Sequence, residues 1–196
     1  MKFRSLALAL AVVLSAYLPF GSAMADPPPS LDAPEWAQGP HSAMHMLLEK
    51  TLLALDVLAV DIRVSKQVHR RFVEVIGNNK RYTEKLGADL AAVVLEADEA
   101  LVQVRYLRKI SFSQWLEGVN ENLDRAEAAK LITPEVRRRV QERLPLIFAA
   151  LKERGYERGD RLFYRLRSGA VRMVVVSEKG TIYVDQIDSG KSPRAS

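Results

Sequence analysis

The sequence contains no cysteine and carries little net charge, and each shortage excludes a class of protein. Without cysteine the chain has neither disulfides nor thiolate metal ligands, so its hydrophobic core must hold the fold. The formal net charge is only +5, which is no signature of nucleic-acid binding. We therefore expect no nucleic-acid partner.

Long apolar runs are also missing, apart from one near the start. Lys2 and Arg4 precede an apolar stretch from Leu6 to Leu18, and Ala23-Met24-Ala25 follows. This stretch is about 13 residues long, whereas a membrane-spanning helix needs about 20. The pattern predicts a secretory signal peptide over residues 1–25, cleaved after Ala25, with an uncleaved anchor as the alternative. We expect a periplasmic or secreted bacterial protein with no transmembrane segment in the mature chain.

The mature chain divides into a linker, one domain and a tail. Removing the leader removes Lys2, Arg4 and no acidic residue, so the net charge falls from +5 to +3. Residues 26–43 are rich in proline and predict a linker. Trp36 within it is interpreted as docking onto its own domain, with binding to a partner as the alternative. Residues 44–188 are expected to form one domain and residues 189–196 a disordered tail.

The first half of the domain mixes strand and helix patterns. Residues 46–64 alternate loosely between apolar and polar side chains, which favours a strand or a bent pair of strands, while a helix from Met44 to Leu55 is the competing interpretation. Apolar residues at helical spacing predict helices over residues 66–76, ending at Gly77, and over residues 82–97, with Thr83 as N-cap.

The second half predicts one strand, two helices and three further strands. Residues 100–110 alternate as in a strand covered on one face. A helix capped by Ser111 or Ser113 follows over residues 114–130, and a second begins at Thr133-Pro134, is kinked by Pro145 and ends at Gly155. Three short strands close the chain, over residues 160–167, 170–177 and 181–186. The fold class is therefore α+β: a mainly antiparallel sheet with helices packed on one face.

Three passages in this order resemble the chalcone isomerase-like family. They are the early strand Leu55–Val60, the strand and helix Arg105–Ile110 and Gln114–Asn122, and the closing hairpin that runs from Gly159–Tyr164 to Val174–Gly180. The resemblance covers roughly Met46 to Asp185. It implies the chalcone isomerase fold, which is shared by enzymes that close a chalcone to a flavanone and by relatives that bind fatty acids without catalysis.

The resemblance also implies a ligand site with three candidate residues. Trp115 stands where the enzymes have a catalytic tyrosine, Asp56 falls near a pocket threonine, and Asn122 matches a pocket asparagine. The position of the family's pocket arginine falls near Met44. An indole has no hydroxyl to relay a proton, and a carboxylate at Asp56 would repel a phenolate. The chain is therefore expected to be exported and non-catalytic, and to bind a small apolar ligand such as a fatty acid, with no catalytic residue and no cofactor. The alternative is an intramolecular lyase or isomerase acting on a phenolic or unsaturated carbonyl compound.

Three further clusters have a functional and a structural interpretation. His41, His45 and Glu49 would line up for a metal on a helix, but a linker that leads into a strand is preferred, so no metal is expected. The arginines from Arg137 to Arg143, with Lys152, Arg154 and Arg158, form either a surface for an acidic or lipid partner or a solvated helix face; interleaved glutamates favour the latter. Asp56, Asp61 and Arg63 are interpreted as edge-strand charges, with a buried polar cluster as the alternative. The sequence identifies no protein partner.

Overall fold

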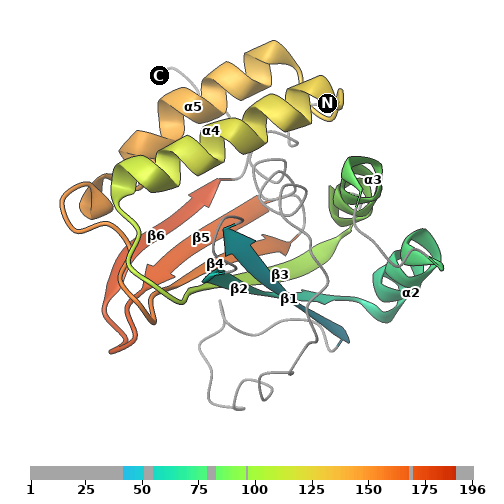
Figure 1. Cartoon of the computed structure of the whole chain (residues 1–196), viewed down its shortest axis with the longest axis horizontal. Helices are drawn as coiled ribbons and strands as arrows, with labels where there is room; N and C mark the ends of the chain where they lie inside the picture. Colours follow the sequence, from blue (N-terminus) through green and yellow to red (C-terminus); the bar gives the residue numbers. More distant parts are fainter. Residues whose placement is uncertain (1–41, 51–54, 79–82, 96, 168–169, 189–196) are drawn as a thin grey trace, which may run out of the picture.

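The computed structural model describes residues 42–50, 55–78, 83–95, 97–167 and 170–188, which form a six-stranded antiparallel sheet and four α-helices (Figure 1). Each strand pairs with its neighbour in the chain, in the order β1 to β6. The strands are β1 Ser42–Lys50, β2 Leu55–Val64, β3 Glu99–Tyr106, β4 Arg161–Arg167, β5 Ala170–Val176 and β6 Ile182–Asp188. The helices are α2 Lys66–Ile76, α3 Glu84–Leu95, α4 Phe112–Ala128 and α5 Pro134–Ile147, with a short 3₁₀ helix η2, Ala149–Leu151. The predicted leader, nearly all of the linker and the tail lie outside the described residues.

The first two strands form a bent antiparallel pair, which confirms the strand interpretation of residues 46–64. Ser42 lies opposite Val64 and Lys50 opposite Leu55, with a register shift between Leu48 and Glu49. The competing prediction of a helix from Met44 to Leu55 is therefore wrong. The backbone of β1 forms its hydrogen bonds with the neighbouring strand β2, and not within its own segment as in a helix. His45 and Glu49 consequently lie on a strand, where a spacing of four does not produce a helical metal site. His41 lies outside the described residues.

Side-chain caps fix where the helices begin. The hydroxyl of Ser65 accepts a hydrogen bond from the Val68 amide at the start of α2, and that of Thr83 accepts one from the Leu86 amide before α3. Ser111, one of the two predicted caps, forms a reciprocal capping box with Gln114 at the start of α4. These local bonds explain why the sequence alone located the beginnings of the helices closely.

Helix α5 begins as predicted but ends early. Thr133 caps it and Pro134 occupies its first turn. It ends at Ile147, within a turn of Pro145, and η2 follows, whereas the sequence predicted a helix that continues to Gly155. The correction has a physical reason, since a proline inside a helix removes one donor and crowds the carbonyl four residues earlier.

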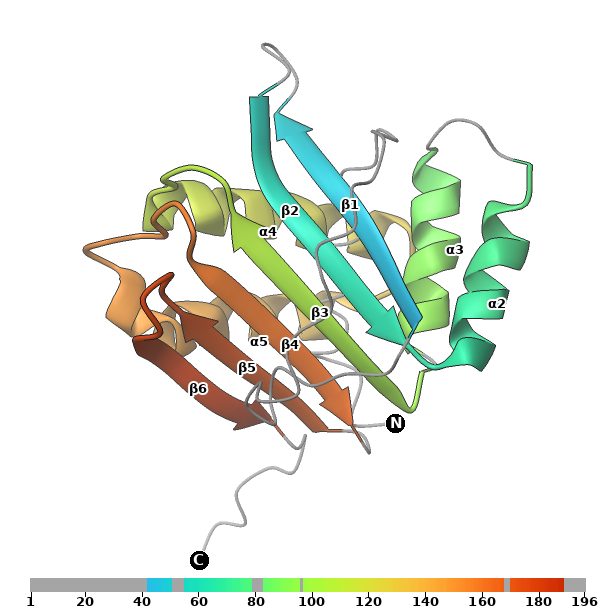
Figure 2. The ribbon, with the colours of Figure 1, turned by 90° about the horizontal axis from the view of Figure 1, so that it is seen from below.

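The sheet has one apolar face, and the helices cover it. Apolar side chains of β2 to β6 form one core with residues of α2 to α5. Figure 2 shows the sheet from its other face, with α4 and α5 behind the strands. An antiparallel sheet with helices on one face is the predicted α+β class. Because α4 runs across the sheet, its inner side chains point into the interior between helix and strands.

A short connection ties the end of α5 to the sheet. Tyr156 and Ile110 exchange two backbone hydrogen bonds of 2.9 Å, and Gly159 donates to the Tyr106 carbonyl. Gly155 adopts φ +67°, and a Cβ on it would lie 2.4 Å from the Ile110 carbonyl oxygen. Only glycine fits this position without moving the backbone.

Replacing Gly155 therefore tests how tightly this connection is held. We expect Gly155→Ala to lower the free energy of unfolding by about 1–3 kcal/mol or more, because it combines left-handed strain with a backbone clash. Gly118→Ala is the matched control: it lies inside α4 with open space around the added methyl, and should raise stability by up to about 1 kcal/mol. Urea unfolding measures both, and equal effects at the two sites would contradict this account.

Candidate functional site

Two of the three candidate residues lie on the inner face of α4. Trp115 is 9% exposed and Asn122 is 6% exposed. They are seven residues apart, which is two helical turns and about 10.5 Å along the axis. Val119 lies between them on the same buried face. The helix therefore carries both side chains into the interior beside the sheet.

Trp115 lies in a cluster of aromatic rings. Its ring centroid is 4.8 Å from that of Phe148, 5.5 Å from Phe112 and 5.6 Å from Tyr156. Tyr156 in turn stacks on Tyr106 with centroids 4.0 Å apart. This contact joins β3, α4, the end of α5 and the following connection at one point. Aromatic packing of this kind stabilises by about 0.5–1.5 kcal/mol per pair beyond area burial.

Three buried tyrosines surround this point, and none is disposed to lose its proton. Burial raises the pKa of Tyr106, with Tyr164 adding to the effect and the Tyr156 and Trp115 side chains acting against it. Burial likewise raises the pKa of Tyr156, with Tyr106 and Tyr164 adding to it, and burial alone raises the pKa of Tyr164. At neutral pH these phenols stay protonated, so they can donate a hydrogen bond but are poor general bases.

Two buried polar atoms in this interior lack a partner among the described residues. Asn122 Oδ1 and the Tyr156 hydroxyl have no hydrogen-bond partner. Tyr106 lies close enough to raise the pKa of Tyr156. The Tyr156 hydroxyl nevertheless has no donor or acceptor at hydrogen-bonding distance and angle. An unpaired buried polar group costs about 1–3 kcal/mol, so each such atom calls for an explanation. By contrast, the neighbouring Asn120 accepts a hydrogen bond from Gln141 at 3.0 Å, which links α4 to α5.

The third candidate, Asp56, is not placed with the other two by any described side-chain contact. Asp56 belongs to β2, and its backbone pairs with that of Glu49 in β1, next to the register shift. Its side chain is not among those that the structure describes. Asp61 and Arg63 lie farther along β2, which is an inner strand between β1 and β3. Their interpretation as edge-strand charges is therefore wrong, because β1 forms the edge of the sheet.

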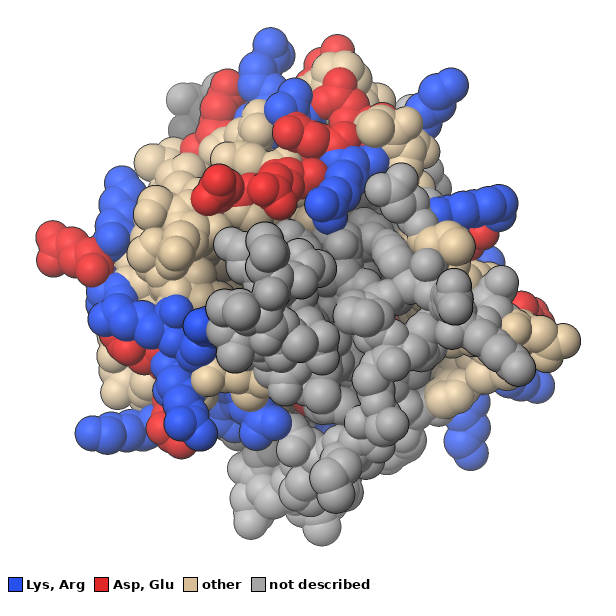
Figure 3. All heavy atoms as spheres, in the orientation of Figure 1, with Lys and Arg blue, Asp and Glu red and all other residues tan. Residues whose placement is uncertain are grey.

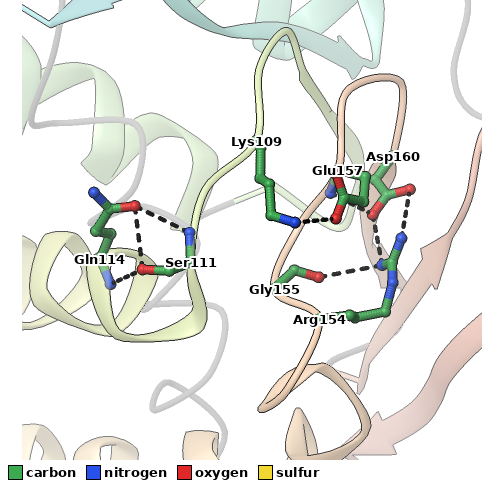
Figure 4. A network of polar contacts seen from close by, with 7 residues as sticks. All are labelled: Lys109, Ser111, Gln114, Arg154, Gly155, Glu157 and Asp160. Carbon is green, nitrogen blue, oxygen red and sulfur yellow. Dashed lines mark hydrogen bonds and ion pairs between the residues drawn. The ribbon is translucent and has the colours of Figure 1, made fainter.

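The connection after α5 holds a polar network, which Figure 4 shows. Arg154 Nη1 lies 2.7 Å from the Asp160 carboxylate, which is almost completely buried and also accepts the Glu157 amide at 2.9 Å. Hydrogen bonding to Asp160 raises the pKa of Arg154. Lys109 bonds Glu157 at 2.7 Å across the same connection. The network closes the gap between the end of β3 and the start of β4.

The end of α5 at Ile147 corrects the prediction of which residues form the basic helix face. Lys152, Arg154 and Arg158 follow the end of α5, so they do not extend its row of arginines. Arg137 on α5 pairs with Asp124 and Glu127 of α4. Figure 3 shows acidic and basic side chains interleaved over α4 and α5. These contacts favour the interpretation of this surface as a solvated helix face.

Sequence reasoning missed the tyrosine cluster as a unit. Tyr106 and Tyr164 are spaced two residues from the inward apolar side chains of their strands, so their inward orientation was readable. Tyr156 carries no such signal, since it lies in a short irregular connection between two glycines. Arg154 and Asp160 are six residues apart, a spacing that indicates no pair in either a helix or a strand.

A scan against protein-family models found no match to this chain, and a search of curated proteins found no significantly similar sequence. Among the described residues, no three His, Cys, Asp or Glu side chains gather where they could hold a metal ion. Within the same residues no helix has the length and apolar character needed to cross a membrane.

The buried ion pair should contribute more to stability than an exposed one. We expect Asp160→Asn to lower the free energy of unfolding by about 3 kcal/mol, because Arg154 and the Glu157 amide would lose a charged partner. Asp185→Asn is the matched control: its bidentate pair with Arg172 is about one-third exposed and should cost less than about 1 kcal/mol. Urea unfolding of both variants decides, and a larger loss at Asp185 would contradict the assignment.

The raised tyrosine pKa values predict that stability falls at high pH. Tyrosines of the unfolded chain ionise near pH 10, while Tyr106, Tyr156 and Tyr164 keep their protons when folded. The native state then binds more protons, so their contribution is fully present below about pH 10 and is lost as the pH rises further. Urea unfolding at successive pH values should show this slope, and Tyr164→Phe should reduce it. Ionisation of Tyr106, Tyr156 and Tyr164 near pH 10 in the folded protein would disprove it.

Proposed function

We propose that this is an exported, non-catalytic domain of the chalcone isomerase-like type that binds a small apolar ligand, such as a fatty acid, between α4 and the sheet. Its N-terminal pattern supports export. The resemblance rests on an order of a strand or bent pair of strands, two helices, one strand, two helices and three strands, and the described elements follow that order. The observation that carries the proposal is the buried, unpartnered Asn122 Oδ1 on the inner face of α4.

The chemistry of this atom restricts the ligand. An amide oxygen accepts hydrogen bonds, so the polar end of the ligand must donate one, as a hydroxyl or a protonated carboxyl group does. Val119 and Trp115 continue the same helix face toward the tyrosine cluster. An acyl chain lying along this face would replace contacts among apolar side chains with contacts of the same kind. An apolar surface with few polar groups is the usual composition of a small-molecule site.

The same residues supply little that could catalyse a reaction. Trp115 can donate a hydrogen bond from its indole but has no hydroxyl through which to relay a proton. The buried phenols hold their protons more firmly than an exposed tyrosine, so they do not accept one from a substrate at neutral pH. Asn122 neither gains nor loses a proton in this range. Binding without turnover is the function that this set of side chains supports.

Substituting Asn122 tests ligand binding independently of folding. Asn122→Leu removes the unpartnered oxygen while keeping a side chain of similar shape, so we expect the stability of the free protein to stay equal or rise by about 1 kcal/mol. Affinity for a fluorescent polyene fatty acid should fall roughly tenfold, the equivalent of one hydrogen bond at about 1.4 kcal/mol. Fluorescence titration and urea unfolding measure the two effects. Asn120→Leu is the control, because Gln141 already satisfies its amide oxygen: it should lower stability and leave affinity unchanged.

Native mass spectrometry of the protein purified from its own host checks the class of ligand directly. A bound lipid-like mass that is lost in Asn122→Leu supports the proposal. Chalcone supplied to the purified protein should yield no flavanone. Turnover that Asn122→Ala abolishes would overturn the non-catalytic assignment and favour the isomerase or lyase alternative.

A further inference from the structure

Three connecting segments meet at one end of the sheet. The backbones of Ile110 and Tyr156 exchange hydrogen bonds, which joins the connection before α4 to the connection after α5. A Cβ on Gly159 would lie 2.8 Å from the side chain of Glu178, so the latter connection also touches the turn between β5 and β6. These segments lie at the left of the molecule in Figure 1 and in Figure 2. We call them together the loop end, which comprises residues 107–111, 146–161 and 177–182.

The loop end carries an excess of positive charge. Its basic residues are Arg108, Lys109, Lys152, Arg154, Arg158, Arg161 and Lys179, and its acidic residues are Glu153, Glu157, Asp160 and Glu178. Lys109 pairs with Glu157, and the buried Asp160 pairs with Arg154. Outside these two pairs, five cations remain against two carboxylates. Figure 3 shows basic side chains gathered at the left of the molecule, where the loop end lies. This surface therefore favours an anionic partner.

Two large apolar side chains are exposed at the same end. Leu146, just before η2, is 71% exposed, and Ile182, the first residue of β6, is 49% exposed. Helix η2 lies against β6, which brings both residues to the loop end. One exposed apolar side chain on a surface is ordinary. Aliphatic side chains that protrude among basic ones are instead typical of surfaces that bind at the interface of a membrane.

We propose that the loop end binds the surface of an anionic lipid bilayer. Its basic side chains lie at the negatively charged headgroups, and Leu146 and Ile182 enter the boundary between headgroups and acyl chains. An acidic protein would attract the same cations but would leave the two aliphatic side chains next to its own charges. A bilayer accommodates both kinds of side chain. This inference concerns exposed residues only and is independent of the ligand proposed between α4 and the sheet.

Sedimentation with lipid vesicles tests the proposal on the whole protein, in whichever processed form the host yields. We expect binding to vesicles that contain phosphatidylglycerol, and binding at least roughly tenfold weaker to vesicles of phosphatidylcholine alone. Salt at about 1 M, where the Debye length is about 3 Å, should weaken the binding to phosphatidylglycerol. No fatty acid is added, so the result is independent of the outcome for the fatty-acid site.

Charge reversal identifies the surface that binds the vesicles. Arg158→Glu combined with Lys179→Glu should lower the vesicle partition coefficient at least about 25-fold, because each basic side chain at a membrane surface contributes about fivefold. Arg138→Glu combined with Arg139→Glu is the matched control. It reverses two exposed charges on α5, outside the loop end, and should leave the partition coefficient nearly unchanged. Circular dichroism confirms that each variant is folded.

Removal of the aliphatic side chains distinguishes a bilayer from an acidic protein. Leu146→Ser combined with Ile182→Ser should lower the partition coefficient severalfold without changing the charge of the protein. Val73→Ser is the control, because Val73 on α2 is 57% exposed but lies outside the loop end. It should leave vesicle binding unchanged.

Three outcomes would contradict the proposal. The first is equal or absent binding to vesicles with and without phosphatidylglycerol. The second is an equal loss of binding in the loop-end and α5 charge variants, which would indicate a general effect of charge. The third is binding that the serine variant retains in full and that soluble polyglutamate abolishes, which would identify an acidic protein as the partner.

Discussion

The buried carboxylate of Asp160 holds the two halves of the sheet in register. β3 and β4 are adjacent in the sheet but are separated in the chain by α4, α5 and η2, so their pairing depends on how the chain returns after those helices. Arg154 and the Glu157 amide converge on Asp160, whose own carbonyl accepts the Tyr106 amide. A buried carboxylate is tolerated only when such donors surround it. The position of α4 over the sheet follows from this closure.

The closure also determines where the aromatic cluster forms. Tyr156 pairs with Ile110 through its backbone, and this fixes its ring against Tyr106 and Trp115. Two segments therefore line the interior beside α4: β3, which precedes the two helices in the chain, and the connection that contains Tyr156, which follows them. A shift of one residue in this return would turn every side chain of β4 to the opposite face. It would exchange Tyr164 and Phe163 between the two faces of the sheet.

The elements that could be predicted from the sequence are those that local chemistry specifies. Ser65, Thr83, Ser111 and Thr133 mark helix starts because a cap satisfies amides only two or three residues away. The closing strands were readable from alternation and from their glycine-containing turns. The end of α5, the Arg154–Asp160 pair and the position of Tyr156 were not readable, because they depend on contacts made after the chain has crossed the sheet. All three candidate residues were named from the resemblance alone. In the structure Trp115 and Asn122 share the buried face of α4, whereas no described contact brings Asp56 to them.

The contrast between Asp160 and Asn122 separates structure from function in this interior. Both are buried polar side chains, and a fold that needed only stability would satisfy or replace each of them. Asp160 has an arginine and a backbone amide as partners, so its burial is explained by the closure of the sheet. Asn122 Oδ1 has no partner among the described residues, and an apolar residue there would stabilise the core. Under the proposed function, the ligand supplies the hydrogen-bond donor that this atom lacks among the described residues.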